Sequence, residues 1–177
     1  MNAALPRRAA LGLLAATLAA PALATPVRGV RRLRIENAHT GERFSGAYFA
    51  DGLYLEEESL ALDRVLRDHV ADEATMMDVR LYDLLSELQR DLGVAAPVTV
   101  TSGYRTHATN ERLRRRNRWA AKGSLHVPGM AADIKVKGVS GARLVRIAKA
   151  LGRGGVGSYG GASFIHVDVG DVRSWAR

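Results

Sequence analysis

Two short segments in the second half of the chain carry residue types that bind metal ions. His126 lies in a turn that contains proline and glycine, and Asp133 follows at the start of a strand-like run. In residues 164–169 (FIHVDV), apolar and polar residues alternate, so His166 and Asp168 share one strand face. Two histidines and one carboxylate leave a tetrahedral zinc with an open position for water, as in catalytic sites. The spacing alone fits equally a surface turn and a polar strand pair.

The amino-acid composition excludes several kinds of active-site chemistry for this chain. Its 177 residues are 47% apolar and 25% charged, which fits an ordinary globular domain. The absence of cysteine excludes a thiol nucleophile, a thiolate zinc site and disulfide stapling. Any metal must therefore be held by carboxylates and by some of the five histidines.

The helices and strands that we expect around these residues indicate an α+β domain. We expect a small antiparallel sheet, with helices packed on one side and an N-terminal hairpin formed by residues 30–36 and 43–49. Periodic apolar residues predict a helix from about residue 56 to Val70, a second from the cap Asp78 to the stop Gly93, and a third from the cap Ser140 to Gly152. Further strands are expected at residues 98–101, 131–136, 156–159 and 164–169.

The amino terminus has the features of a secretory signal. Arg7-Arg8 precedes an apolar run at residues 9–20, and Ala22-Leu23-Ala24 is a small-residue cleavage site. A bilayer-spanning helix needs roughly 20 apolar residues, so this run is too short for an anchor. We expect residues 1–24 to be a twin-arginine signal peptide and residues 25–177 to be a single, periplasmic domain.

The formal net charge is +8, from 26 Lys plus Arg against 18 Asp plus Glu. A basic domain outside the cytoplasm rarely meets nucleic acid, so cell-wall polymers and membrane surfaces are the expected anionic partners.

The metal-binding segments together resemble a known family. The pattern Ser124-x-His126-x-x-Gly129-x-Ala131-x-Asp133, followed by His166-x-Asp168, is similar to the signature of the D-Ala-D-Ala metallopeptidases. That family includes zinc D,D-carboxypeptidases, vancomycin-resistance dipeptidases, phage endolysins and small exported murein endopeptidases. The resemblance to the last of these groups extends over residues 37–42 (NAHTGE), 102–106 (SGYRT), 154–157 (GGVG) and 173–175 (RSW). It implies an exported zinc peptidase that cleaves peptidoglycan stems or cross-links, with a zinc cleft in the fold.

The resemblance also implies roles for single residues. His126, Asp133 and His166 would be the zinc ligands, and zinc would lower the pKa of its water to about 7 and polarise the scissile carbonyl. Ser163 occupies the position of the glutamate that acts in the dipeptidase branch and cannot serve as a base. Asp168 is therefore expected to be the general base. Branches with His-x-His suggest the alternative that Asp168 is a ligand and His166 is the base or a partner of a ligand.

Two further residues near these segments have expected roles. By resemblance, Arg105 would lie beside the zinc and stabilise the oxyanion of the tetrahedral intermediate, although it could also be a surface arginine that closes a turn. Ser124 is expected to orient the loop, because no His and Asp relay is visible for it. The remaining histidines lack partners at ligand spacing and are expected to be structural, with His69 at the end of a helix.

Two other patterns suggest functions that we do not expect. Residues 155–160 match Gly-x-Gly-x-x-Gly, but a dinucleotide site needs a following helix, so we expect a tight turn that brings backbone near the site.

The basic run contains Arg105, Arg112, Arg114, Arg115, Arg116, Arg118 and Lys122, with Trp119 among them. In a cytoplasmic protein it would indicate nucleic-acid binding. In an exported protein it is a solvated helix face or a patch that steers anionic peptidoglycan.

These observations favour a monomeric exported zinc metallopeptidase. The main alternative is a non-catalytic module that binds the cell wall or another polyanion and has a degenerate or structural metal site. A weaker alternative is a cytoplasmic nucleic-acid binder.

Overall fold

A β-hairpin opens the described part of the chain, which comprises residues 29–116, 120–160 and 163–177 of this computed structural model. Strands β1 (Arg31–Asn37) and β2 (Arg43–Ala50) pair antiparallel, which confirms the predicted hairpin. Leu33 and Ile35 are fully buried, and the residues between and before them are exposed, as expected for a strand with one face on a core. The predicted signal peptide lies outside the described residues.

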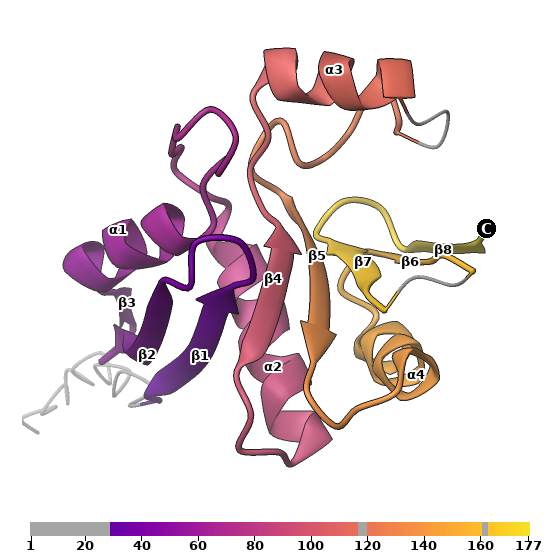
Figure 1. The fold of residues 1–177 in the computed structure, drawn as a ribbon. Coiled ribbons are helices and arrows are strands. Elements are labelled where there is room, and N and C mark those ends of the chain that lie inside the picture. The colour runs from indigo at the N-terminus through magenta and orange to yellow at the C-terminus, as the bar shows by residue number, and fades with distance from the viewer. Residues whose placement is uncertain (1–28, 117–119, 161–162) are drawn as a thin grey trace, which may run out of the picture.

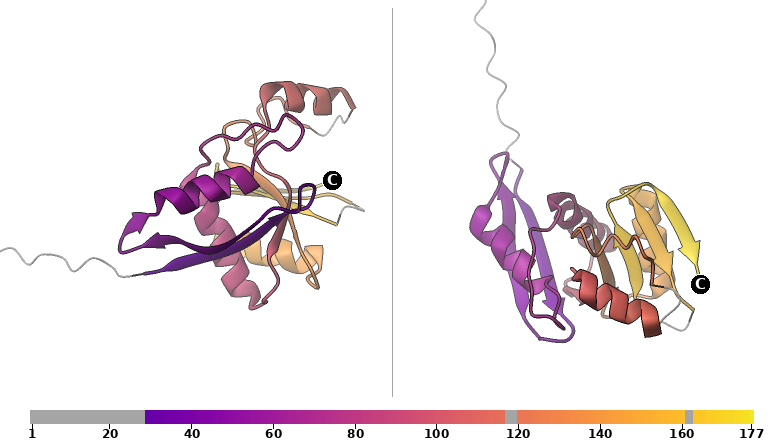
Figure 2. Two further views of the ribbon diagram at one scale, coloured as in Figure 1. Left: turned by 60° about the vertical axis from the view of Figure 1, so that its left-hand side comes forward. Right: turned by 90° about the horizontal axis from the view of Figure 1, so that it is seen from above.

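The sheet is larger than predicted and it is mixed. Its eight strands have the order β3-β2-β1-β4-β5-β7-β6-β8 (Figure 1). The α+β class is confirmed, but the expectation of a small antiparallel sheet is wrong because β1 pairs parallel with β4 and β6 pairs parallel with β8. Figure 2 shows that the hairpin end and the β6–β8 end lie on opposite sides of the molecule. The other strands are β3 (Leu53–Tyr54), β4 (Val98–Ser102), β5 (Ala131–Val136), β6 (Gly155–Ser158), β7 (Ile165–Asp168) and β8 (Arg173–Ala176).

The described ranges contain four helices, and two of them begin and end at the predicted residues. Asp78 caps α2 and Ser140 caps α4, each by accepting a backbone N–H, and both helices end at a left-handed glycine. No helix within the described ranges is long and apolar enough to cross a membrane. The helices are α1 (Glu56–Val65), α2 (Val79–Leu92), α3 (His107–Arg116) and α4 (Gly141–Leu151).

Helix α1 ends earlier than predicted. Val70, the last residue of the predicted stripe, lies in a turn and is 51% exposed. The carboxylate of Asp68 accepts hydrogen bonds from the amides of Val70 and Ala71, at 3.0 and 3.3 Å. Such side-chain bonds offer the backbone an alternative to helical pairing. As a result, His69 lies in this turn instead of at the end of a helix.

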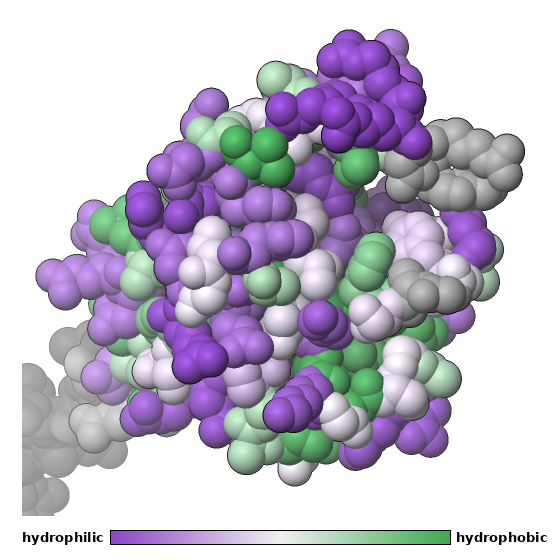
Figure 3. Space-filling view, viewed as in Figure 1, coloured by the Kyte–Doolittle hydropathy of each residue, from purple (hydrophilic) through white to green (hydrophobic). Residues whose placement is uncertain are grey.

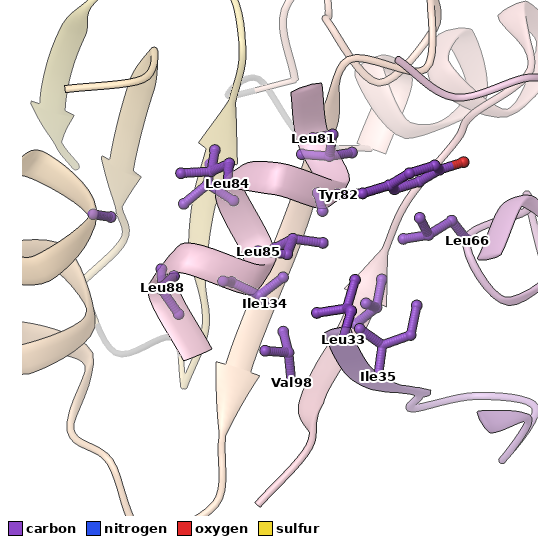
Figure 4. Packing of buried hydrophobic residues seen from close by; sticks show 14 of the residues in the cluster. Leu33, Ile35, Leu66, Leu81, Tyr82, Leu84, Leu85, Leu88, Val98 and Ile134 are labelled. Atoms are coloured by element: carbon purple, nitrogen blue, oxygen red, sulfur yellow. The ribbon is translucent and has the colours of Figure 1, made fainter. Parts of the chain in front are cut away.

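The sheet separates the hydrophobic core from the polar site residues. On β5, Ala132 and Ile134 join the core cluster, whereas Asp133 and Lys135 alternate with them and line a cleft. Figure 4 shows the leucines of α2 packed against strand residues such as Leu33 and Ile134. Helices α1, α2 and α4 all contribute to this core, as predicted, but α3 contributes no apolar residue to it. In Figure 1, α4 lies below strands β6–β8 and α3 lies above them.

Candidate metal centre and active site

Three predicted metal ligands meet at the polar face of the sheet. Asp133 on β5 is the direct antiparallel partner of His166 on β7, so their side chains project side by side. Nδ1 of His166 lies 3.0 Å from Oδ1 of Asp133, and Nε2 of His126 lies 3.3 Å from that oxygen and 3.2 Å from Nδ1 of His166. These three atoms lie within 4.8 Å of one another, so one cation could contact all of them.

A tight turn before β5 positions His126. The amide of Val127 donates to the carbonyl of Ser124, and the amide of Gly129 donates to the carbonyl of His126. Gly129 has φ +70°, a conformation that favours glycine, which explains its place in the His-x-x-Gly pattern. His126 is 2% exposed, and its Nδ1–H donates to the carbonyl of Gly103 at 2.7 Å. That bond leaves the Nε2 lone pair directed toward Asp133 and His166.

Asp168 lies next to the ring of His166, and both oxygens of its carboxylate accept hydrogen bonds. Its Oδ2 accepts from Nε2–H of His166 at 3.0 Å. Oδ1 accepts from the amides of Gly155 and Gly170, each at 3.0 Å, and both oxygens accept from Arg173, at 3.0 and 2.7 Å. The side chain of Asp168 is fully buried. The structure therefore places the expected general base on the side of the His166 ring away from Asp133.

Arg105 extends from the loop after β4 to the other oxygen of Asp133. Its Nη2 donates to Oδ2 of Asp133 at 2.6 Å, and its Nε donates to Oγ of Ser102 at 2.8 Å. Burial alone would raise the pKa of Asp133, but His126, His166 and Arg105 together lower that pKa well below its usual range. Asp133 is therefore an ionised carboxylate at neutral pH.

The pKa values of the two histidines shift in opposite directions. Burial lowers the pKa of His126, which keeps this ring neutral at physiological pH. For His166, burial lowers the pKa, but hydrogen bonds to Asp133 and Asp168 outweigh burial and raise it. A cation at Nδ1 would replace the proton shared with Asp133 and leave the Nε2–H bond to Asp168 in place.

The three residues open into a cleft of about 1400 Å³ on the polar face of the sheet. This volume exceeds the usual range for sites of drug-sized ligands and leaves room for a segment of a polymer. One wall of the cleft is aromatic and lies close to the predicted metal ligands. It contains Tyr159, Phe164 and Trp175, and the ring of Trp175 lies 5.3 Å from that of His166.

Several cleft residues were not predicted from the sequence. His39 and His69 stack with ring centroids 3.9 Å apart and line the cleft, although they were expected to be structural. Strand β8 carries Arg173, which holds Asp168, and Trp175. Most of the glycine-rich tract forms strand β6, which confirms the strand predicted at residues 156–159, and the amide of Gly155 approaches the site as expected. No apolar periodicity marks these positions, and only the resemblance at residues 173–175 drew attention to β8.

Comparison with known proteins identifies the family. The sequence model of the family described as peptidoglycan L,D-endopeptidase MepK matches residues 25–175. The chain belongs to the MepK family. This finding confirms the resemblance to the D-Ala-D-Ala metallopeptidases.

Curated relatives in the MepK family come from several bacteria. The peptidoglycan L,D-endopeptidase MepK of Escherichia coli K12 is 38% identical over 162 residues, which cover 91% of this chain and 89% of the relative. The probable peptidoglycan L,D-endopeptidase MepK of Haemophilus influenzae is 37% identical over 146 residues, which cover 82% of this chain and 78% of the relative. The similarity therefore extends over nearly the whole chain, and the family model covers both predicted metal-binding segments.

Proposed function

We propose that this protein is a zinc-dependent endopeptidase that hydrolyses peptide bonds in peptidoglycan. The observation that carries this proposal is the convergence of Nε2 of His126, Oδ1 of Asp133 and Nδ1 of His166 within 4.8 Å at the base of a large cleft. Membership of the MepK family supplies the reaction class, and the names of the relatives supply the substrate.

The donor set fits zinc. Two imidazoles and one carboxylate are typical protein ligands of a catalytic zinc. Each histidine donates its other N–H to a fixed acceptor, the carbonyl of Gly103 or the carboxylate of Asp168, as metal-bound histidines usually do. When bound, zinc would activate a water molecule and polarise the scissile carbonyl.

Arg105 is the cation nearest to this donor set and would contribute to catalysis directly. Its guanidinium is held by Ser102 and Asp133 at the edge of the site. A fixed donor in this position would stabilise the negative charge that develops on the carbonyl oxygen of the substrate. We retain the oxyanion role of Arg105 in the proposed function.

Asp168 acts as a positioning residue in this proposal. A general base needs an oxygen within hydrogen-bonding reach of the proton that it removes. Both Asp168 oxygens already accept hydrogen bonds from His166, Arg173 and two backbone amides. The carboxylate would therefore fix the ring orientation and tautomer of His166 and leave Nδ1 available for the metal.

The bond that is cleaved and the place of action follow from the relatives and from the amino terminus. Because the relatives are named L,D-endopeptidases, we propose that the scissile bond joins an L centre to a D centre in a cross-link. The protein would act as a monomer in the periplasm, exported through a twin-arginine signal in residues 1–24. It would have no stable membrane span after cleavage of this signal.

Product analysis tests the cleaved bond. Purified protein would be incubated with cross-linked muropeptide dimers that contain either an L,D or a D,D bridge, and the products would be identified by mass spectrometry. Cleavage of the L,D-bridged dimers alone is expected. Cleavage of the D,D-bridged dimers alone would overturn the proposed specificity, and binding without cleavage of either dimer would favour a wall-binding module.

A further inference from the structure

Helix α3 presents two of its arginines to the cleft and two elsewhere. Arg112 and Arg116 both line the cleft. They are four residues apart, so they lie on one face of the helix. Arg114 instead pairs with Glu111 at 2.7 Å, and neither Arg114 nor Arg115 is among the cleft-lining residues. The basic run is therefore not a uniform solvated face, because Arg112 and Arg116 are part of the site wall.

A third cation lies on the floor of the same cleft. Lys135 follows the metal ligand Asp133 by two residues on β5, so both side chains are on the same face of that strand. Figure 1 shows α3 above the upper ends of β4 and β5, and in Figure 3 hydrophilic side chains cover this end of the molecule. Arg112 and Arg116 thus extend the cleft from the metal centre toward α3, whereas Lys135, which pairs with Thr99, lies on the side of Asp133 away from α3.

These three cations have no carboxylate partner among the described residues, unlike the arginines at the metal centre. Arg105 is paired with Asp133, and Arg173 is paired with Asp168. Within the described ranges, the acidic side chains that line the cleft are Asp68 and Asp133. Asp68 is 2% exposed and accepts from the hydroxyl and amide of Thr106 at 3.1 and 3.0 Å. The α3 side of the cleft is therefore positively charged and uncompensated.

We propose that Arg112 and Arg116 form a subsite for the free carboxylates of a peptidoglycan stem peptide. This inference rests on the proposed function and adds the chemical group that the enzyme recognises away from the scissile bond. A guanidinium can hold a carboxylate with two parallel hydrogen bonds, and a concave wall of one charge concentrates anionic ligands. The subsite would orient the stem so that its cross-link lies over the metal centre.

The chain itself offers a matched control for the test. The double variant Arg112→Gln/Arg116→Gln removes two charges from the cleft face of α3. The variant Arg114→Gln/Arg115→Gln removes the same two charges from the same helix outside the cleft. Both variants and the wild type would be assayed on cross-linked stem peptides with free carboxylates and on the same peptides with these carboxylates amidated. Thermal melting and zinc content would show that each variant is folded and loaded.

For the free-carboxylate substrate, we expect the cleft-face variant to lower kcat/KM by about 10- to 100-fold, mainly through KM. The outer-face variant should stay within about threefold of the wild type, because neither Arg114 nor Arg115 lines the cleft. On amidated substrate, the wild type and the cleft-face variant should become nearly equal.

Equal losses in the two double variants would overturn the subsite, because net charge would then explain the effect. The subsite proposal would also be overturned if the wild type cleaved the free-carboxylate and the amidated substrates at the same rate. Failure of the wild type to cleave either substrate would instead contradict the proposed function itself.

Discussion

Nε2 of His166 lies 3.0 Å from Oδ2 of Asp168, while Nδ1 of the same ring lies 3.0 Å from Oδ1 of Asp133. The two carboxylates therefore hold the imidazole from opposite sides. Asp168 in turn receives two hydrogen bonds from Arg173 on the last strand. A chain of contacts thus connects β8 to the nitrogen that faces the metal centre.

This relationship predicts that Asp168→Asn weakens metal binding instead of abolishing the chemical step. The amide would place N–H groups against Arg173 or against backbone amides, so His166 would lose its fixed orientation. We expect zinc affinity to fall by about 10- to 100-fold and activity to recover largely at saturating zinc. Zinc titration with an activity readout measures both quantities. Unchanged zinc affinity with no activity at any zinc concentration would show that Asp168 is the general base.

Substitution of Arg173 should have the same effect in a weaker form. Arg173→Gln removes the cation that holds both oxygens of Asp168, but it leaves the bonds from Gly155 and Gly170 in place. Zinc affinity should therefore fall by less than in Asp168→Asn, and Arg173→Lys should restore part of the loss. The same titration measures this order, and a larger loss in Arg173→Gln than in Asp168→Asn would contradict the proposed chain of contacts.

Arg105 should contribute to turnover more than to substrate binding. For Arg105→Gln we expect kcat to fall by about 10²- to 10³-fold at saturating zinc, with a smaller change in KM, because a donor to the oxyanion acts mainly in the transition state. Steady-state kinetics on a cross-linked muropeptide would measure the two constants. Arg34→Gln, at an exposed position of β1, is the matched control. If the change fell on KM alone, the proposed role of Arg105 would be wrong.

Gly103 connects the loop after α1 to the predicted metal ligand His126. A Cβ at this position would clash with the backbone oxygen of Leu66, and neither segment can move freely because Tyr104 donates to that oxygen. We expect Gly103→Ala to lower the free energy of unfolding by about 1–3 kcal/mol and to weaken zinc binding through the displaced His126 contact. Gly141→Ala, where a Cβ meets nothing within 4 Å, should do neither. Denaturant unfolding and zinc titration compare the two variants.

Asp68 should stabilise the fold in a pH-dependent way. Burial would raise its pKa, but hydroxyl and amide donors outweigh burial and lower the pKa. The unfolded-state pKa of an aspartate is about 3.9. Because the folded-state pKa of Asp68 is lower, its ionised carboxylate stabilises the folded protein above that pH. This stabilisation is lost as the pH falls through the folded-state pKa. Asp68→Asn should therefore cost about 2–3 kcal/mol at pH 7 and less at pH 3, below the unfolded pKa. Urea unfolding at both pH values measures the difference, and a constant difference would contradict the role of the charge.

Local rules explain why much of the site could be predicted from sequence. Strand alternation placed His166 and Asp168 on one face, and cap residues fixed the ends of α2 and α4. The resemblance, and not the spacing, selected His126, Asp133 and His166 as a set. Asp133 and His166 meet because β5 and β7 pair in a register that brings them opposite each other, and the turn before β5 brings His126 to them.

Long-range contacts account for what the sequence did not predict. The surroundings of Asp168 come from Gly155, Gly170 and Arg173, which belong to three separate segments. The parallel pairing of β8 with β6 leaves no pattern in a four-residue strand. His39 and His69 stack only because the hairpin turn and the loop after α1 meet over the sheet.

The most direct test of the central claim is a zinc titration of metal-free protein, followed by incubation with cross-linked muropeptides. The wild type should bind about one zinc per chain and should cleave the dimers only when zinc is present. His126→Ala, Asp133→Ala and His166→Ala should each lose both properties. Cleavage that persists after chelation and in all three variants would contradict the account, because these residues would then not hold the metal on which hydrolysis depends.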